Sequence, residues 1–202
     1  MLGKRAGATA LALLSTAIAV PACAQQTILA YYDNTQKAEF KVPVVATVGG
    51  RCGFAAAALP SGTWDAGEID MPGWAHQFGF TLECTGLSRV AVTSANGGLK
   101  SAVTPISSGF TTLAPYTVGL SVVHNTGTAT AECAAADLLA SAGTACGFKG
   151  TAAPGTGLAI PSPSYNLASS YLEVRYAAPP SGSQLAAGQY TDTLTVTVSP
   201  AT

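Results

Sequence analysis

A strict alternation of apolar and polar residues near the C-terminus restricts the fold more than any other feature. The apolar members are Leu194, Val196 and Val198, and the polar members are Thr193, Thr195 and Thr197. A period of two places the apolar side chains on one face of a β-strand, a conformation that β-branched residues favour. The pattern therefore predicts a half-buried strand over residues 190–198.

The same period of two recurs along the chain. The other predicted strands cover 77–84, 89–94, 116–123 and 171–177, with a weaker one over 53–59. Clusters of Gly, Pro, Asn and Ser between these runs predict turns. No long helical period occurs, although alanine richness allows a short helix over 135–141. Six short strands separated by turns predict an all-β, antiparallel β-sandwich.

Charge is scarce in this chain, and its scarcity excludes one class of partner. Only 9% of the 202 residues are charged, and nine basic residues nearly balance ten acidic ones. A formal net charge of -1 provides no basic surface for nucleic acid, so a nucleic-acid partner is not expected. The length is that of one domain with a sizeable core.

The first 24 residues have the pattern of a secretory signal peptide. Lys4 and Arg5 precede an uncharged apolar stretch over 6–20, and Ala22-Cys23-Ala24 forms an A-x-A cleavage site. We expect cleavage after this motif and export of the mature chain. The alternative is a lipoprotein signal that would place a lipid on Cys23, but a proline just before the site is unusual for it.

Four cysteines remain after cleavage, an even number that predicts two disulfide bonds in an exported protein. Three connectivities are open, and we favour sequential pairing because both pairs then close local loops. The pairs are Cys52 with Cys84 and Cys133 with Cys146. A metal site is the alternative, but there is no C-x-x-C motif and the two histidines do not fit a four-ligand spacing. We therefore expect no metal and no cofactor.

The number of predicted strands is one short of an immunoglobulin-type sandwich, which needs about seven. A further amphipathic strand, over residues 37–48, precedes the first of these cysteines. Its apolar face includes Phe40, Val42, Val44, Ala46 and Val48. A strand of this kind can fill the hydrophobic groove of a neighbouring molecule, where main-chain hydrogen bonds supply affinity and alternating side chains set the register.

Three segments carry a family resemblance. They are residues 40–52, residues 78–86, which end in Leu-Glu-Cys-Thr-Gly, and residues 187–198, which read Ala-Gly-Gln-Tyr-Thr-Asp-Thr-Leu-Thr-Val-Thr-Val. They resemble the Csu-type pilins, the archaic chaperone-usher pilus subunits whose domain is also called spore coat protein U. The resemblance implies an incomplete immunoglobulin-like antiparallel β-sandwich that is completed by a donor strand from a neighbouring subunit.

The resemblance also implies partners, a location and site residues. The partners would be other pilin subunits, a periplasmic chaperone and an outer-membrane usher, with the product a cell-surface fimbria that supports adhesion and biofilm formation. The donor-strand residues would be Phe40, Val42, Val44, Ala46 and Val48, and the family's disulfide would join Cys52 to Cys84. The implied organisation is a signal peptide over 1–24, an N-terminal extension with the donor strand over 25–51, and a pilin domain over 52–202.

A second function class is a self-contained secreted β-sandwich that binds a carbohydrate or a protein. In that case the strand over 37–48 would complete its own domain, and Trp64 and Trp74 would be candidates for stacking on a sugar. An enzyme is not expected, because the chain has no G-x-S-x-G, H-E-x-x-H or P-loop motif.

The remaining polar candidates are interpreted as structural. We expect His76 to be a loop histidine and His124 to lie at a strand end. Asp65, Glu68 and Asp70 lie close together, but their spacing matches no calcium-binding loop, so we expect a solvated acidic turn.

Overall fold

The computed structural model describes most of the chain from residue 43 onward. The described residues are 43–47, 49–57, 62–70, 73–104, 108–143, 146–178 and 184–201. The chain divides into two units, residues 1–46 and 47–202. The expected signal peptide, and Phe40, Val42 and Val48 of the expected donor strand, lie outside the described residues.

Strands are the main regular secondary structure of the second unit, as the period-two alternation predicts. The longer strands are β1 (Trp74–Phe80), β3 (Ser88–Ser94), β7 (Thr117–His124), β8 (Gly127–Ala134), β11 (Ser170–Tyr176) and β14 (Leu194–Pro200). The shorter ones are β2 (Glu83–Cys84), β4 (Leu99–Ser101), β5 (Phe110–Thr111), β6 (Leu113–Ala114), β9 (Leu158–Ile160), β10 (Ser164–Tyr165), β12 (Gln184–Leu185) and β13 (Tyr190–Thr191). A single turn of 3-10 helix, η1 (Ala135–Leu138), follows β8. Within the described ranges, no helix has the length and apolar character needed to span a bilayer.

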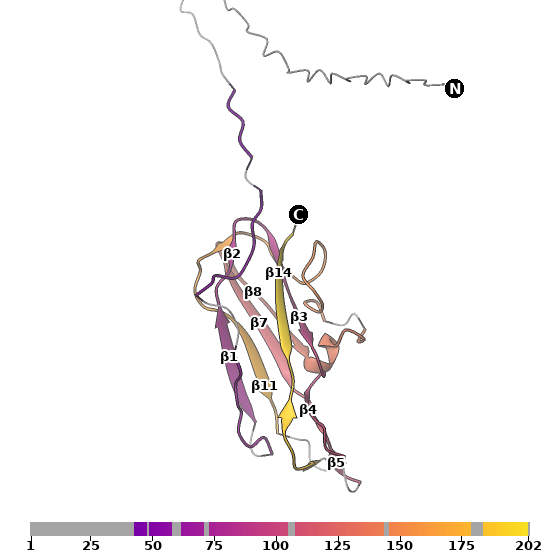
Figure 1. Cartoon of the computed structure of the whole chain (residues 1–202). Coiled ribbons are helices and arrows are strands. Elements are labelled where there is room, and N and C mark those ends of the chain that lie inside the picture. Colours follow the sequence, from indigo (N-terminus) through magenta and orange to yellow (C-terminus); the bar gives the residue numbers. More distant parts are fainter. Residues whose placement is uncertain are drawn as a thin grey trace, which may run out of the picture. The chain divides into compact units, whose positions relative to one another are not determined.

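Two antiparallel sheets form the two layers of this unit. One has the strand order β1-β11-β7-β8 and the other the order β14-β3-β9, and in Figure 1 strands β14 and β3 lie in front of β7 and β8. In the first sheet Phe78 pairs with Leu172, which also pairs with Leu120. In the second sheet Val196 pairs with Val92. The predicted all-β, antiparallel architecture is confirmed.

The core lies between the two sheets and is filled from alternate strand positions. Val90 and Val92 of β3, Val118 and Val122 of β7, and Phe148 from the loop before β9 have no exposed surface. Burying apolar surface contributes about 25 cal/mol per Å² and is the main stabilising term in a fold of this kind. Apolar residues from both sheets share one cluster, which is the arrangement of a β-sandwich.

One side of the sandwich is closed by packed elements. Strand β8 contacts β9, and η1 contacts both β3 and β8, with Leu138 and Phe148 fully buried among them. Gly157 allows β9 to approach β3 closely, because its φ is +101° and a Cβ there would lie 2.7 Å from the carbonyl oxygen of Val90.

Both disulfides follow the sequential pairing, which is therefore confirmed. Cys52 is bonded to Cys84, and Cys133 at the end of β8 is bonded to Cys146. The first bond attaches the start of the second unit to the region between β1 and β3. Three backbone hydrogen bonds of 2.9–3.0 Å support the same attachment: Ala55 N to Thr81 O, Glu83 N to Gly53 O, and Thr85 N to Arg51 O.

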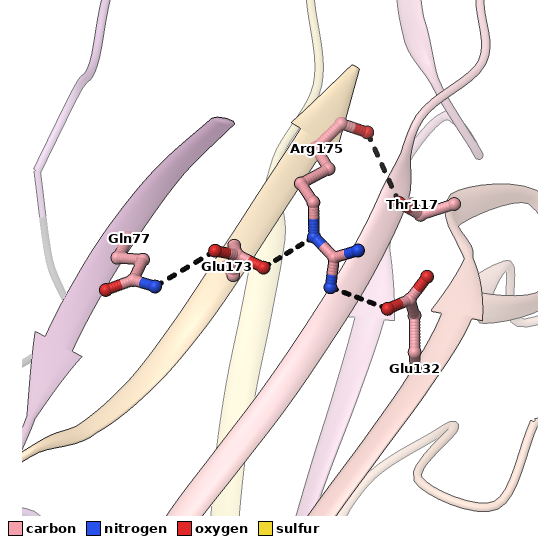
Figure 2. A network of polar contacts seen from close by, with 5 residues as sticks. All are labelled: Gln77, Thr117, Glu132, Glu173 and Arg175. Carbon is pink, nitrogen blue, oxygen red and sulfur yellow. Dashed lines mark hydrogen bonds and ion pairs between the residues drawn. The ribbon is translucent and has the colours of Figure 1, made fainter. Parts of the chain in front are cut away.

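A polar network crosses the outer face of the four-stranded sheet (Figure 2). Gln77 Nε2 donates a hydrogen bond of 2.9 Å to Glu173 Oε1, and the Arg175 guanidinium contacts both Glu173 and Glu132, the latter at 2.6 Å. Thr117 Oγ1 donates to the Arg175 carbonyl oxygen at 3.4 Å. Hydrogen bonds from Gln77 and then Arg175 lower the pKa of Glu173. The network joins all four strands on the solvated face, so the polar side chains in it already have hydrogen-bond or ion-pair partners.

Several predicted elements differ in extent from the observed ones. The strand expected over 77–84 begins earlier, at Trp74, and is interrupted before Glu83. The weak strand expected over 53–59 is reduced, in its described part, to one bridge between Phe54 and Leu82. The helix expected over 135–141 is only the turn Ala135–Leu138, because alanine richness by itself does not outweigh the surrounding β-structure.

Strand β8 was not predicted, and its composition explains why. Its half-buried positions are Ala129, Ala131 and Cys133, which alternate with exposed residues. Small side chains produce a weak apolar alternation even though their spacing has a period of two. The strand forms because its full length pairs with β7, from Thr117–Ala134 to His124–Gly127.

We predict that removing the first disulfide destabilises the domain more than removing the second. The bonds close loops of 32 and 13 residues, and loop entropy assigns them about 3.7 and about 2.9 kcal/mol respectively. The variants are Cys52→Ala/Cys84→Ala and Cys133→Ala/Cys146→Ala, and urea unfolding of the mature chain followed by circular dichroism measures both. An unchanged midpoint for the first variant would contradict the prediction.

Candidate functional site

The side of the sandwich opposite the closed one lies between two edge strands. Strand β1 pairs only with β11, and β14 pairs only with β3. Each strand therefore has one edge along which no other strand pairs within the described part of the chain. Unpaired N–H and C=O groups along an edge are a template for another strand. The candidate site is the groove between these two edges.

The groove is lined mainly by apolar side chains and has a volume of about 350 Å³. Strand β1 contributes Trp74 and Phe78, and β14 contributes Leu194 and Val196. The remaining lining residues are Leu172 and Val174 of β11, with Leu99, Tyr116, Asp192, Thr193 and the segment 62–64. We call this feature the β1/β14 groove.

The apolar side chains that β1 and β14 themselves contribute to the groove are incompletely buried. Leu194, Val196 and Val198 of β14 are half-buried, and so are Trp74 and Phe78 of β1. The residues that pair with two of them are fully buried, since Val90 and Val92 of β3 have no exposed surface. An apolar face that is covered on one side of a sandwich and open on the other presents a ready surface for an added strand.

A carboxylate organises one end of the groove. Asp192 Oδ2 accepts hydrogen bonds of 2.6 Å from both Tyr116 Oη and Ser94 Oγ. Asp192 Oδ1 accepts from the backbone N–H groups of Asn96 at 2.9 Å and Thr193 at 2.7 Å. These bonds separate β13 from β14 and divide the single strand predicted over 190–198. The carboxylate therefore holds β14 and the β3–β4 turn together at the groove's end.

The environment of Tyr116 keeps its phenol protonated. Burial raises the pKa of Tyr116 far above its ordinary value, and the hydrogen bond to Asp192 and the negative charge of Asp192 raise it further. The neutral phenol is the form that donates to the carboxylate, so the same contact that orders this end of the groove favours protonation.

An aromatic cluster lies along the β1 side of the groove. The Trp64 ring stacks on His76 with ring centres 4.3 Å apart and meets Trp74 edge-on at 4.6 Å. His76 also meets Phe78 at 4.7 Å, and Trp74 lies 5.8 Å from Tyr176. His76 lies within β1, which corrects the expectation of a loop histidine. The structure also brings Trp64 and Trp74 together.

Two buried polar atoms near this cluster have no hydrogen-bond partner among the described residues. They are Trp74 Nε1 and Tyr176 Oη. Burial without a partner costs free energy, so both donors favour an arrangement that supplies an acceptor. Burial also raises the pKa of Tyr176, with smaller contributions from Tyr190 and Asp70.

The expected donor strand is represented here by residues 43–47, which are exposed and have no regular secondary structure. Val44 and Val45 expose 89% and 88% of their surface, and Ala46 is exposed as well. Such exposure is unusual for two adjacent valines.

The other predicted site residues lie as follows. His124 ends β7 as expected, and its Nδ1 lies 2.8 Å from Ser162 Oγ. Asp65, Glu68 and Asp70 are exposed, as expected for a solvated acidic segment, and Asp65 Oδ1 accepts from Gly67 N at 2.9 Å. The described residues contain no cluster of His, Cys, Asp and Glu able to hold a metal ion.

Sequence reasoning missed the roles of Trp64 and Asp192. Asp192 falls inside a strong strand pattern, where an isolated aspartate is a signal for a break, and that signal was available. The contacts of Trp64 depend on how the loop before β1 returns to the sheet, which no local pattern specifies.

No protein-family model matches this chain, and neither the curated proteins nor the solved structures include a significant match.

We predict that the Tyr116–Asp192 pair makes the domain sensitive to alkali. An unfolded tyrosine ionises near pH 10, whereas folded Tyr116 keeps its proton, so the free energy of unfolding falls above about pH 10 by about 1.4 kcal/mol per pH unit for this residue. Tyr116→Phe should make the decline shallower by that amount. Urea unfolding between pH 8 and pH 11 measures it.

Tyr176 and Tyr190 also have raised pKa values, so a smaller decline should persist in Tyr116→Phe. Tyr165→Phe, at an exposed position on β10, is the matched control and should keep the full slope. Identical slopes for the parent chain and Tyr116→Phe would contradict the prediction.

Proposed function

We propose that this protein is a structural subunit of a surface fibre and that its subunits join by donor-strand complementation. In this proposal the β1/β14 groove of one copy accepts the strand around residues 40–48 of a second copy. Two observations together carry it. The groove is flanked by two edges that have no further strand partner within the described part of the chain, and a segment of the same chain exposes Val44 at 89%.

The dimensions of the two parts agree. Strand β14 has 7 residues and spans about 23 Å, and residues 40–48 extend over about 27 to 30 Å at the rise of a strand. The donor can therefore lie along the whole of β14. Pro43 lacks an N–H, so the added strand forms one ladder bond fewer at that position.

The chemistry of the two parts agrees as well. The donor face carries Phe40, Val42, Val44, Ala46 and Val48, and the groove is lined mainly by apolar side chains. Burying five such side chains contributes about 5 to 10 kcal/mol before ordering costs. Edge N–H and C=O groups of β1 and β14 add main-chain hydrogen bonds. Such a junction dissociates slowly.

This mechanism gives each subunit one donor and one acceptor. Head-to-tail contacts of that kind generate a filament when the rotation between successive subunits does not close a ring. A subunit with an open groove needs protection before assembly, and an exported subunit needs a route to the surface. A periplasmic chaperone, an outer-membrane usher and other pilin subunits are the proposed partners, with a cell-surface fimbria as the destination and adhesion and biofilm formation as its roles.

A gel comparison of the mature chain tests the proposal directly. We expect a ladder of detergent-resistant multimers in unboiled samples that collapses to a monomer on boiling, because the junction is non-covalent and apolar. A chain lacking residues 25–48 should give no ladder. A single monomer band from the full mature chain would contradict fibre formation and favour a self-contained binding module.

Val44 and Val45 provide a matched pair for the donor face. Both are exposed to nearly the same extent, but in an extended strand their side chains point in opposite directions. Val44→Asp places a carboxylate in an apolar groove, at a cost of several kcal/mol, and should abolish the ladder. Val45→Asp should leave the ladder intact, and loss of the ladder in both variants, or in neither, would contradict the assigned donor face.

A mixing experiment separates donor from acceptor. Val196→Asp charges the groove wall while leaving residues 40–48 unchanged, and Val44→Asp does the reverse. Each variant alone should remain monomeric. Mixed together they should form a two-subunit species and no longer multimer, because the only intact donor and the only intact groove are on different chains. Longer multimers in the mixture would exclude a one-donor, one-groove mechanism.

A further inference from the structure

The β1/β14 groove is partly covered by a residue of its own chain. Gly62, Thr63 and Trp64 contribute to its lining, and the Trp64 ring rests against Trp74 and His76 of β1. Trp64 is half-buried in this position. The large apolar ring therefore occupies space at the edge strand that an added strand would need.

The segment that carries Trp64 is not part of any ladder. Residues 62–70 have no regular secondary structure, and neither a β-bridge nor a backbone hydrogen bond connects them to a strand within the described part of the chain. The bond from Gly67 N to Asp65 Oδ1 lies within the segment itself. The contacts of Trp64 with the groove are thus made by aromatic packing, with half-buried Ile69 packed on the core as a second point of attachment.

We propose that Trp64 is a displaceable cover of the β1/β14 groove and that the incoming donor strand must move it away before it can pair with the groove. This inference rests on the proposed function. It assigns the segment 62–70 a role in setting the rate at which a free subunit accepts a partner.

The physical basis is a competition between two kinds of contact. An open apolar groove flanked by unpaired edges promotes aggregation, and Trp64 reduces the apolar surface that Trp74 and His76 present to water. Aromatic contacts of this size hold the ring in place without a backbone ladder. A donor strand offers both alternating apolar side chains and main-chain hydrogen bonds, so it replaces the cover once it arrives.

The acceptor for the test is the full mature chain carrying Val44→Asp, which keeps its groove but cannot donate. The probe is a fluorescein-labelled synthetic peptide with the sequence of residues 37–48. Association is followed by fluorescence anisotropy. Trp64→Ala in this background should accelerate association by about tenfold, because the stacking contacts no longer have to break. Tyr165→Ala, which removes an exposed aromatic residue from β10, is the matched control and should leave the rate unchanged.

A second readout uses Trp64 itself and does not depend on a deletion at that position. The chain contains two tryptophans, and both line the groove. Trp74→Phe in the Val44→Asp chain leaves Trp64 as the only tryptophan, which is excited selectively at wavelengths that tyrosine does not absorb. Saturation with unlabelled peptide should shift its emission to longer wavelength, as the ring leaves the groove for water. A peptide with aspartate at the Val44 position should produce no shift.

The outcomes distinguish the cover from the junction. Faster association in Trp64→Ala together with the red shift supports the proposal. Peptide binding at equal rates with unchanged Trp64 emission overturns the cover and leaves the donor-strand proposal standing. If the peptide binds neither the Val44→Asp chain nor the same chain with Trp64→Ala, the result overturns both the cover and the donor-strand proposal.

Discussion

Two edge strands without a second partner are the constraint on which the rest of this structure depends. Strands β1 and β14 belong to different sheets, and each is paired on one side only within the described part of the chain. The apolar residues that these two strands contribute to the groove remain half-buried, while the opposite side is closed by β8, β9 and η1. The contrast between a closed side and a side with half-buried apolar residues leads from the fold to the proposed function.

A fold with an open side needs other means to keep its frame in place. Asp192 satisfies four donors and joins β14 to the turn after β3. The Cys52–Cys84 bond attaches the start of the domain beside β1, and the Cys133–Cys146 bond fastens the closed side. Because these interactions do not depend on a further strand, the groove is already shaped before any partner arrives. A preformed groove lowers the ordering cost of strand addition.

Much of this frame was predictable because its causes are local. Alternating residues such as Leu194, Val196 and Val198 predict a strand whatever it packs against. Sequential pairing of the four cysteines likewise predicts the observed bonds. The predictions were less accurate where the signal was weak or depended on distant residues. Strand β8 presents only small residues to the core, and the expectation of a loop at His76 is wrong because β1 includes this residue.

The sequence by itself determined the all-β class, the presence of two disulfides and an apolar stripe that includes Val44, since each of these depends on side-chain period or count. Only the tertiary structure decided which side of the sandwich stays open. It also decided that Trp64 lies against Trp74 and His76 in the groove, and that Asp192 binds Tyr116, 76 residues away. These contacts join residues far apart in the chain, and no local pattern encodes them, because they exist only once both sheets have packed around one core.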